Sequence, residues 1–407
     1  MPLLYSLVVS VAKAITPIVG KSAKTKAFVQ GRKALWAQLE GIPSNKKVVW
    51  MHCASLGEYE QGLPVLTGLK SKHPEHFYLV TFFSPSGYEV RKNDGIADLA
   101  TYLPWDTKAD VKRFVALVNP VMALLVKYEF WPNLIRALQA KEVPLFLISG
   151  LFRANQIFFT PWGGSYRKLL RGFTHLFVQN QASLKLLQSI GVQEVSISGD
   201  TRFDRVGTSK EPLSFMDTFV GARKCIVAGS TWPEDEAVLL EAIRQTPKDW
   251  CWLIAPHEMH EEKLHQLMAK LPGGSLRYTQ NEEAAFDGCP VLVLDTVGML
   301  GRCYPYAKIA YVGGGMGTSG LHNILEPAAE GIPVIIGKNY DKFPEAKDLI
   351  ALGGVISVTT ADDCSKQLSI LQENDALRSE KSNANSNYVC TNQGATAKTL
   401  SLLNQHL

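Results

Sequence analysis

The sequence has few cysteines, little net charge and no internal repeats, and each absence excludes a class of protein. The 7 cysteines in 407 residues include no Cys-x-x-Cys pair, which argues against a zinc framework and is typical of reduced thiols in a cytoplasm. A formal net charge of +4 is too small to indicate a nucleic-acid partner. A hydrophobic content of 46% is enough for a large core, and because 407 residues exceed what one core usually organises, we expect two domains.

The N-terminal segment is apolar and then basic. Residues 1–20 are almost uniformly apolar but include Lys13, which disfavours a bilayer span of about 20 residues, and no clear signal-cleavage site follows. Up to residue 47 the only acid is Glu40, against eight basic residues: Lys13, Lys21, Lys24, Lys26, Arg32, Lys33, Lys46 and Lys47. This pattern favours a helix lying on an anionic membrane surface. The alternative is an ordinary N-terminal helix packed on its own domain.

Short β-branched or aromatic runs alternate with helical patterns along the rest of the chain. The runs form two series, 47–52, 77–83, 121–127, 144–149 and 174–179, then 225–229, 250–256, 291–295, 308–313 and 333–337. Such alternation predicts parallel βαβ units, and a polar interruption at 207–212 separates the series. We therefore predict an α/β protein with two doubly wound domains, at 47–206 and 223–407, joined by a linker at 207–222 and preceded by a segment at 1–46. The last helix is expected to pack back on the first domain.

A glycine-rich loop at 313–317 follows one predicted strand and leads to a predicted helix after Ser319 that carries Asn323 and Glu326. Glycine lets backbone N–H groups approach an anionic oxygen, and a carboxylate in the following helix can accept hydrogen bonds from ribose hydroxyls. The loop is therefore a candidate phosphate and nucleotide site. The alternative is that its glycines only allow a helix to pack closely on a strand.

Three charged residues follow predicted strands of the first domain, where ligands of doubly wound sheets bind. Glu58 follows the first strand and could act as a general base, or could only complement a helix dipole. Glu129 lies among aromatic residues, where desolvation would raise its pKa. Arg202 follows a further strand expected at 194–198 and could bind an anion. Together they suit group transfer to a hydroxyl, although structural ion pairs would explain each one separately.

Seven motifs in this order resemble those of the Kdo (3-deoxy-D-manno-octulosonic acid) transferases of lipopolysaccharide assembly. They are Ser-Leu-Gly-Glu at 55–58, Phe-Ser-Pro-Ser-Gly at 83–87, Glu-Phe-Trp-Pro-Asn at 129–133, Gly-Asp-Thr-Arg-Phe-Asp at 199–204, Gly-Ser-Thr at 229–231, His-Asn-Ile-Leu-Glu-Pro at 322–327 and Asn-Gln-Gly-Ala at 392–395. The resemblance runs from about residue 47 to the C-terminus. Any one motif is weak, but chance is a poor explanation for seven in order.

The resemblance implies a GT-B fold and inverting transfer of Kdo from CMP-Kdo to the lipid A precursor (lipid IVA), at the cytoplasmic face of a Gram-negative inner membrane. It implies that Glu58 is the general base and that Glu129 and Arg202 support the reacting centre. The implied donor contacts are Ser230, Thr231, Pro256, His257, Val297, Gly298, Met299, Gly314, Gly315, Asn323, Ile324, Leu325 and Glu326. A phosphorylated acceptor in an anionic membrane would suit Lys21, Lys24, Lys26, Arg32 and Lys33.

The chain departs from the family at residues 256–261, where Pro-His-Glu-Met-His-Glu replaces the usual Pro-Arg-His-Pro-Glu-Arg, and Arg202 replaces a common Lys. His257 would then add a pH-dependent positive charge near the departing phosphate. No cofactor or obligatory metal is expected, because the sequence has no Asp-x-Asp site for a metal and a diphosphate. Two alternatives remain open: a GT-B enzyme that uses a UDP-sugar, and a non-catalytic nucleotide- or lipid-binding protein.

Overall fold

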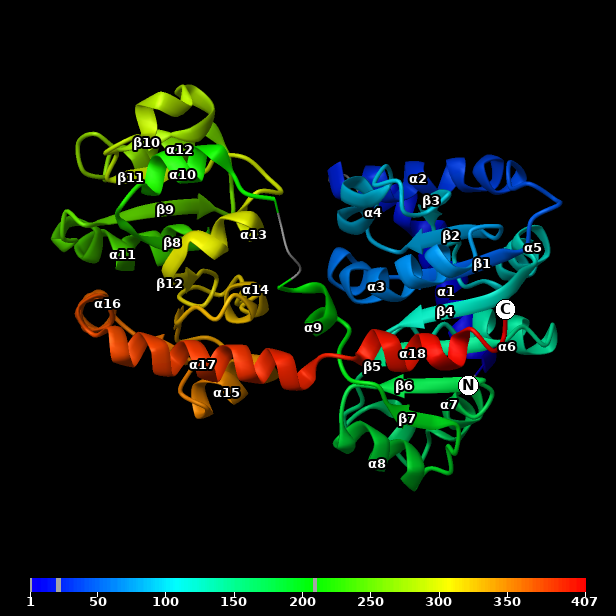
Figure 1. The fold of residues 1–407 in the computed structure, drawn as a ribbon. Helices are drawn as coiled ribbons and strands as arrows, with labels where there is room; N and C mark the ends of the chain where they lie inside the picture. The colour runs from blue at the N-terminus through cyan, green and yellow to red at the C-terminus, as the bar shows by residue number, and fades with distance from the viewer. Residues whose placement is uncertain (1, 20–22, 208–210) are drawn as a thin grey trace. The chain divides into compact units, whose positions relative to one another are not determined.

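The computed structural model describes residues 2–19, 23–207 and 211–407, without the side chains of residues 2, 3, 17–19, 23–25 and 27. The chain forms two units (Figure 1). Unit 1 consists of Met1–Arg205 and Asn392–Leu407, and unit 2 of Val206–Thr391. The final helix therefore belongs to unit 1, although the segment that directly precedes it in the chain, Val206–Thr391, forms unit 2.

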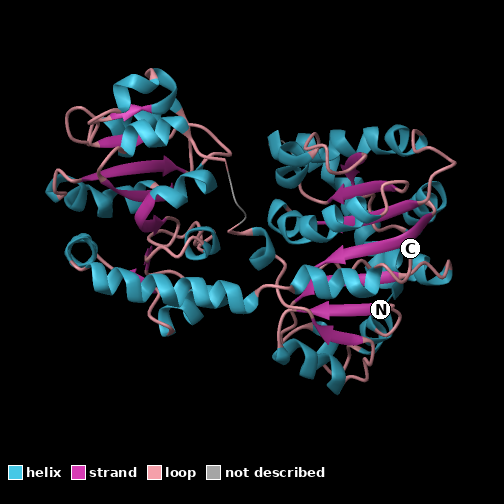
Figure 2. Cartoon of the chain, in the orientation of Figure 1, coloured by secondary structure: helices cyan, strands magenta, loops and turns pink. Residues whose placement is uncertain are grey.

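Unit 1 is built on a seven-stranded parallel sheet with the order β3-β2-β1-β4-β5-β6-β7. Figure 2 shows helices on both sides of this sheet. The strands are β1 (Val48–Cys53), β2 (Phe77–Phe82), β3 (Leu99–Tyr102), β4 (Pro120–Val126), β5 (Leu145–Gly150), β6 (His175–Val178) and β7 (Val195–Ile197). The helices are α1 (Pro2–Val19), α2 (Ala23–Glu40), α3 (Leu56–Lys72), α4 (Pro85–Arg91), α5 (Lys108–Val118), α6 (Pro132–Ala140), α7 (Gly164–Leu170), α8 (Gln181–Ser189), α9 (Arg202–Arg205) and α18 (Ala395–Leu403), with a 3-10 turn η1 at Ile157–Phe159.

Strand β1 shows why the sheet needs cover on both faces. All six of its residues are buried, and successive side chains point to opposite faces. Val48 and Trp50 enter the core on one face, while Val49, Met51 and Cys53 enter the core on the other. Near-continuous apolar runs are typical of such doubly covered parallel strands. The strand order reverses between β1 and β4, so the loops after these two strands border the crevice where doubly wound sheets bind ligands.

Unit 2 repeats the architecture with a parallel sheet ordered β10-β11-β9-β8-β12-β13-β14. The strands are β8 (Lys224–Thr231), β9 (Trp250–Pro256), β10 (Leu276–Arg277), β11 (Val291–Val293), β12 (Ala307–Val312), β13 (Val334–Gly337) and β14 (Val355–Val358). The helices are α10 (Ser214–Val220), α11 (Pro233–Gln245), α12 (Glu261–Met268), α13 (Leu300–Cys303), α14 (Leu325–Ala329), α15 (Pro344–Ala351), α16 (Ala361–Glu373) and α17 (Asp375–Asn392), with 3-10 turns η2 (Tyr278–Gln280), η3 (Glu283–Phe286) and η4 (Tyr304–Tyr306).

Every strand that the sequence predicts is present, which confirms two doubly wound domains. Strands β3, β10 and β14 have no counterpart among the predicted runs, and all three lie at the edges of the sheets. They are four residues long or shorter, so they carry no recognisable apolar run. Helix α18 contacts α3 in unit 1, where Gly68 leaves room for the side chain of Leu400.

Candidate active site

Glu58 lies in the first turn of α3, directly after β1. Ser55 has the extended conformation of an N-cap residue, and the side chain of Glu58 turns back toward it. The amide N–H of Ala54 donates a hydrogen bond to Oε2 of Glu58 at 2.5 Å. This bond holds the carboxyl group at the carboxyl end of β1 rather than out in solvent.

The surroundings of Glu58 raise its pKa to about 7. Burial is the largest cause, and the negative charge of Glu129 adds to it. The Ala54 hydrogen bond and the ammonium group of Lys127 act in the opposite direction. A carboxyl group with a pKa near 7 is matched to proton transfer at physiological pH.

Glu129 follows β4 and is held by two aromatic side chains. Its Oε2 lies 2.9 Å from Nε2 of His52 and accepts a hydrogen bond from Nε1 of Trp131 at 2.6 Å. The other ring nitrogen of His52, Nδ1, lies 2.9 Å from both the carbonyl oxygen and the hydroxyl oxygen of Thr81. Contacts at both ring nitrogens thus hold the imidazole beside Glu129.

Arg202 begins α9 and is committed to an ion pair. Its Nε and Nη2 lie 2.9 and 2.8 Å from Oδ2 of Asp200. Burial alone would raise the pKa of Asp200, but Arg202 and a hydrogen bond from Gln61 hold that pKa below its usual value. Burial raises the pKa of Tyr128. The negative charge of Glu58 raises it further, whereas the positive charge of Arg202 lowers it. The structure thus brings Glu58, Glu129 and Arg202 to one edge of the unit 1 sheet.

Two non-glycine residues at this edge have left-handed backbone conformations. Lys127 follows β4 with φ of 63°, and Ser149 lies near the end of β5 with φ of 53°. Such conformations cost about 1–3 kcal/mol each and cluster at ligand sites. Strain at the ends of these two neighbouring strands therefore also indicates a functional edge.

In unit 2, His257 and His322 stack with Trp232. The rings of Trp232 and His257 are 4.6 Å apart, those of the two histidines are 4.4 Å apart, and Nε1 of Trp232 donates to Nε2 of His322 at 3.0 Å. Burial lowers the pKa of His257, and burial together with His257 lowers that of His322 to about 4. Burial therefore favours the neutral form of both rings. That His257 adds a pH-dependent positive charge near the departing phosphate stays a prediction, and burial acts against that charge.

The glycine loop after β12 is held by Asp235, a fully buried residue in the first turn of α11. The carboxylate accepts hydrogen bonds from the amides of Gly314 at 2.7 Å and Met316 at 3.3 Å, and from the hydroxyl group of Tyr311 at 2.9 Å. The expectation that the loop's amides point to a phosphate is thus wrong for Gly314 and Met316. Gly314 itself is required because its φ is 88° and a Cβ atom there would lie 2.1 Å from the oxygen of Gly320.

The helix that carries Glu326 begins later than predicted. It starts at Leu325 rather than after Ser319, because residues 317–324 run as turns and extended chain. Asn323 precedes the N-cap residue Ile324. Its Oδ1 accepts from the amide of Leu325 at 3.1 Å, and its Nδ2 donates to Glu326 at 3.2 Å. Burial and the negative charge of Glu326 both raise the pKa of the hydroxyl group of Tyr304, which follows α13.

The remaining predicted donor residues lie at the ends of other strands of the same sheet. Ser230 and Thr231 end β8, and Ser230 has a φ of 54°. Pro256 ends β9 beside His257, and the segment 297–299 lies between β11 and α13, with Val297 81% exposed. These residues share one edge of the unit 2 sheet, which is the edge where such sheets bind ligands.

The predicted basic side chains of the N-terminal segment divide into three groups. Lys21 and the side chain of Lys24 lie outside the described residues, and Lys26 and Lys33 are exposed. Arg32 is not a surface charge, because it is buried with its guanidinium 3.6 Å from the ring centre of Phe28 and 4.9 Å from that of Phe83. Burial lowers its pKa to about 9. Lys13, Arg32 and Lys33 line a cavity of about 180 Å³ with mainly apolar walls.

Comparison with known proteins finds similarity to one family. Residues 29–205 match the family of 3-Deoxy-D-manno-octulosonic-acid transferase (kdotransferase). The 3-deoxy-D-manno-octulosonic acid transferase of Aquifex aeolicus (strain VF5) is 29% identical over 319 residues, covering 77% of this chain and 83% of that protein. That of Bordetella pertussis is 29% identical over 379 residues, covering 88% of this chain and 87% of that protein. Residues 29–205 thus match the Kdo transferase family, and most of the chain is similar to named Kdo transferases.

These similarities make the protein a glycosyltransferase, and its fold agrees with that conclusion. The UDP-GlcNAc 2-epimerase of Neisseria meningitidis bound to UDP-GlcNAc superposes with a TM-score of 0.61 at 15% identity, over 88% of this chain and 100% of that one. A glycosyltransferase from Rickettsia africae superposes with a TM-score of 0.56 at 13% identity, over 89% of this chain and 99% of that one. At such identities the likeness establishes the fold alone, which is GT-B.

Sequence analysis assigns no role to six residues that shape the two edges. Trp131, Asp200 and His322 stand in the quoted motifs, whereas His52, Trp232 and Asp235 lie outside them. His52 stands in the apolar run that predicts β1, where a polar residue one position before a strand's end is the available signal. Asp235 has none, because one acid among Glu234, Asp235 and Glu236 is not distinguishable from its neighbours without the fold.

Proposed function

We propose that this glycosyltransferase moves Kdo from CMP-Kdo to the lipid A precursor (lipid IVA) with inversion, and that Glu58 is the general base. Its relatives are named for transfer of the same sugar acid. The observation that carries the assignment is the position of Glu58 at the end of β1, with its pKa raised to about 7 by burial and by Glu129. A base of that pKa is half ionised at neutral pH and can still accept a proton readily.

In this mechanism unit 1 binds the acceptor hydroxyl group beside Glu58. The hydroxyl oxygen bonds to the anomeric carbon of Kdo as the bond from that carbon to the phosphate of CMP breaks, and CMP leaves with the bonding electrons. Glu58 takes the hydroxyl proton late in this step, and attack from the face opposite to CMP inverts the configuration. Glu129 keeps the pKa of Glu58 high, and Arg202 with Asp200 stabilises the surrounding charge.

The donor is proposed to bind at the strand-end edge of unit 2. Glu326, oriented by Asn323, would accept hydrogen bonds from the ribose. His322 accepts a hydrogen bond from Trp232 at its Nε2, so the neutral ring carries its hydrogen on Nδ1 and can donate to a phosphate or sugar carboxylate. Because CMP-Kdo has a single phosphate, we expect transfer to need no metal.

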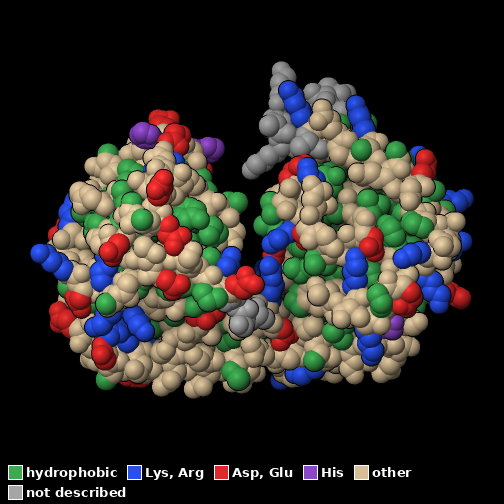
Figure 3. All heavy atoms as spheres, turned by 45° about the horizontal axis from the view of Figure 1, so that its top comes forward, with side chains coloured by type: hydrophobic (Ala, Val, Ile, Leu, Met, Phe, Trp, Pro, Cys, Tyr) green, Lys and Arg blue, Asp and Glu red, His purple; other side chains and the backbone are tan. Residues whose placement is uncertain are grey.

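The acceptor side of the enzyme is proposed to lie on the cytoplasmic face of the inner membrane. Five apolar side chains of α1 are 46–64% exposed: Leu4, Leu7, Val8, Val11 and Ile15. Helix α1 is nevertheless tied to unit 1, because Lys13 pairs with Asp110 at 2.6 Å. Figure 3 shows Lys and Arg side chains among hydrophobic ones on unit 1, a combination suited to anionic lipid. Among the described residues, no helix is long and apolar enough to cross a membrane.

The decisive experiment incubates the purified enzyme with CMP-Kdo and lipid IVA and determines the mass of the product. Glu58→Gln should abolish transfer while CMP-Kdo binding stays within a few-fold, because the amide keeps the shape but cannot accept the proton. Glu60→Gln is the matched control, since Glu60 lies on the same helix but pairs with Arg91 at 2.7 Å. Near-normal turnover by Glu58→Gln would overturn the base assignment, and transfer from a UDP-sugar in place of CMP-Kdo would overturn the donor assignment.

A further inference from the structure

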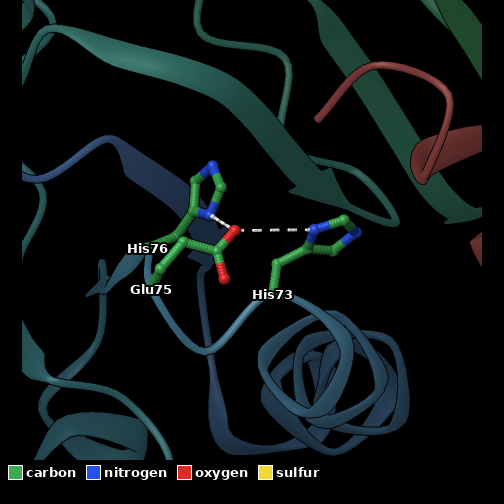
Figure 4. Close-up of side chains that lie close together, drawn as sticks. All are labelled: His73, Glu75 and His76. Carbon is green, nitrogen blue, oxygen red and sulfur yellow. Dashed lines mark ion pairs between the residues drawn. The ribbon is translucent and has the colours of Figure 1, made fainter.

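A turn in unit 1 brings two histidines and a glutamate together. His73 caps the C-terminal end of α3, and Pro74, Glu75 and His76 lead from it to β2. Figure 4 shows Nδ1 of both imidazoles directed at the same carboxylate oxygen of Glu75, at 3.8 Å from His73 and 2.8 Å from His76. One ligand atom from each residue lies within 4.8 Å of the others, and no second group of this kind occurs in the described part of the chain.

The tautomer of His73 is set by Asn404, which caps the end of α18. Nδ2 of Asn404 donates to the carbonyl oxygen of Leu400 at 2.7 Å, so Oδ1 is the atom that faces His73. Oδ1 lies 2.9 Å from Nε2 of His73, and Nε2 therefore carries the hydrogen. In the neutral ring the lone pair of Nδ1 then points toward the carboxylate of Glu75. Two electron-rich atoms face each other, and a cation between them would stabilise both.

The ring of His76 contacts Glu75 but makes no hydrogen bond. The side chain is only 4% exposed, and neither ring nitrogen has a hydrogen-bond partner. Its 2.8 Å separation from Glu75 is that of an ion pair, but the approach is outside hydrogen-bond geometry. Buried polar groups are nearly always satisfied, so this ring calls for a ligand that the side chains alone do not supply. His175 differs, because its Nε2 lies 2.8 Å from the hydroxyl group of Ser196.

We infer that His73, Glu75 and His76 bind a divalent transition-metal ion, with Zn²⁺ as the best match. Two imidazoles and one carboxylate form a ligand set typical of Zn²⁺, whereas Mg²⁺ and Ca²⁺ prefer oxygen alone. Ligand atoms of a tetrahedral zinc site lie about 3.3 Å apart for bonds of about 2.0 Å. The present separations of 2.8 and 3.8 Å bracket that value, and the side chain of Glu75 is 65% exposed and free to adjust. Its exposure also leaves a coordination position open to water.

Such an ion would tie together three parts of unit 1. Its ligands lie at the end of α3 and the start of β2, and Asn404 links His73 to α18 as an outer partner of the kind that orients metal-bound histidines. Pro74 restricts the turn in advance of binding. Glu58 lies fifteen residues earlier on the same helix, about 22 Å away at 1.5 Å per residue. The site is therefore structural, and transfer does not pass through it.

The test is zinc titration of the full-length, tag-free, chelator-stripped protein by calorimetry. All variants are made in a Cys390→Ser protein, called the parent, because Cys390 is an exposed thiol that could bind zinc by itself. We expect one ion per chain. Loss of an outer partner typically weakens metal binding about 10–100-fold, so loss of a ligand in Glu75→Gln or His76→Gln should weaken it at least that much. Glu75 is exposed, so its variant tests the site even if His76→Gln does not fold.

His175→Gln is the matched control, because His175 also faces a glutamate at 3.8 Å but has no second histidine. It should bind zinc as the parent does. Zinc should also raise Tm of the parent and of His175→Gln but not of Glu75→Gln. With EDTA present, Glu75→Gln should transfer Kdo at the rate of the Cys390→Ser protein. Failure of the zinc site and failure of the proposed transfer reaction can therefore be told apart. No binding by the parent, or equal affinity in Glu75→Gln, would overturn the site.

Discussion

Nε2 of His52 lies 2.9 Å from Oε2 of Glu129, and this contact joins the two central strands of the unit 1 sheet at their functional edge. His52 is fully buried in β1, and its other nitrogen is fixed by Thr81 of β2. Contacts at both ring nitrogens hold the imidazole in place. Glu129 is thereby positioned where its charge raises the pKa of Glu58. Three strands thus set the chemistry of one carboxyl group.

Trp131 is the second residue that holds Glu129, and its loss should reduce activity. Trp131→Phe keeps an aromatic ring but removes the N–H that donates to Glu129 at 2.6 Å. A hydrogen bond to a charged group contributes about 1.5–3 kcal/mol, so we expect kcat/KM to fall roughly tenfold or more. Trp162→Phe is the control, because Trp162 is 64% exposed. An equal loss in both variants would show that the effect is not specific to Glu129.

The activity should depend on pH through Glu58. A base must be ionised to accept a proton, so kcat/KM should rise about tenfold per pH unit below pH 7 and level off above it. The same profile is expected for Glu60→Gln, whose substituted group lies outside the reacting centre. Initial rates at fixed ionic strength from pH 5 to 9 would measure it. A flat profile across pH 7 would contradict the assigned role.

Glu58 should also make the folded protein less stable at high pH. Its folded pKa of about 7 exceeds the ordinary value of 4.5, so folding disfavours the ionised group. The penalty is absent below pH 4.5, grows by about 1.4 kcal/mol per unit between pH 4.5 and 7, and is constant above. Glu58→Gln should thus be more stable than wild type by roughly 3–4 kcal/mol at pH 8 and equal to it near pH 4.5. Urea unfolding at both pH values would decide this, and equal stability at pH 8 would contradict the raised pKa.

Asp235 should be essential to the glycine loop. In the wild type the carboxylate of Asp235 accepts hydrogen bonds from several N–H groups, including the amides of Gly314 and Trp232. Asp235→Asn would place a side-chain NH₂ group, which is itself a donor, against these donors. Disrupting such a buried charged network costs about 3 kcal/mol, and the loop between β12 and α14 should loosen. Calorimetry should also find weaker CMP binding. Glu241→Gln, at an exposed position further along the same helix, is the control, and an Asp235→Asn protein of normal stability would refute the role.

Membrane association should depend on the apolar face of α1. Leu7 and Val11 are 61% and 47% exposed on this helix, and replacing either with Asp should weaken binding to anionic vesicles roughly tenfold, since burying such a side chain contributes about 1.5–3 kcal/mol. Lys26→Gln should cost about 1 kcal/mol more and reduce the salt dependence. Leu352→Asp, at a position 57% exposed in unit 2, is the control. If the α1 variants sediment with anionic vesicles as strongly as the wild type, α1 has a purely structural role.

Periodicity in the amino-acid sequence is sufficient to define the architecture and the edges where ligands bind. Apolar runs of five to seven residues separated by helical patterns are buried most readily as parallel strands covered on both faces, so two doubly wound domains follow from them. Ligands bind at the carboxyl ends of such strands, which is why chain order alone points to Glu58, Glu129 and Arg202. Strands β3, β10 and β14 escape this reasoning, because two to four residues cannot show a period.

The behaviour of these residues depends on the tertiary structure, because charge and hydrogen bonding involve neighbours that are distant in the chain. Asp235 accepts hydrogen bonds from amides of a loop about 80 residues later in the chain. In a loop whose sequence resembles an anion-binding site, the amides of Gly314 and Met316 therefore already have an acceptor within the protein. Burial lowers the pKa of His257, and aromatic rings enclose Arg32, although the sequence places both among polar or basic residues. The pKa of Glu58 likewise rises through burial and through Glu129, 71 positions away, a pairing that exists only once β1 and β4 lie side by side.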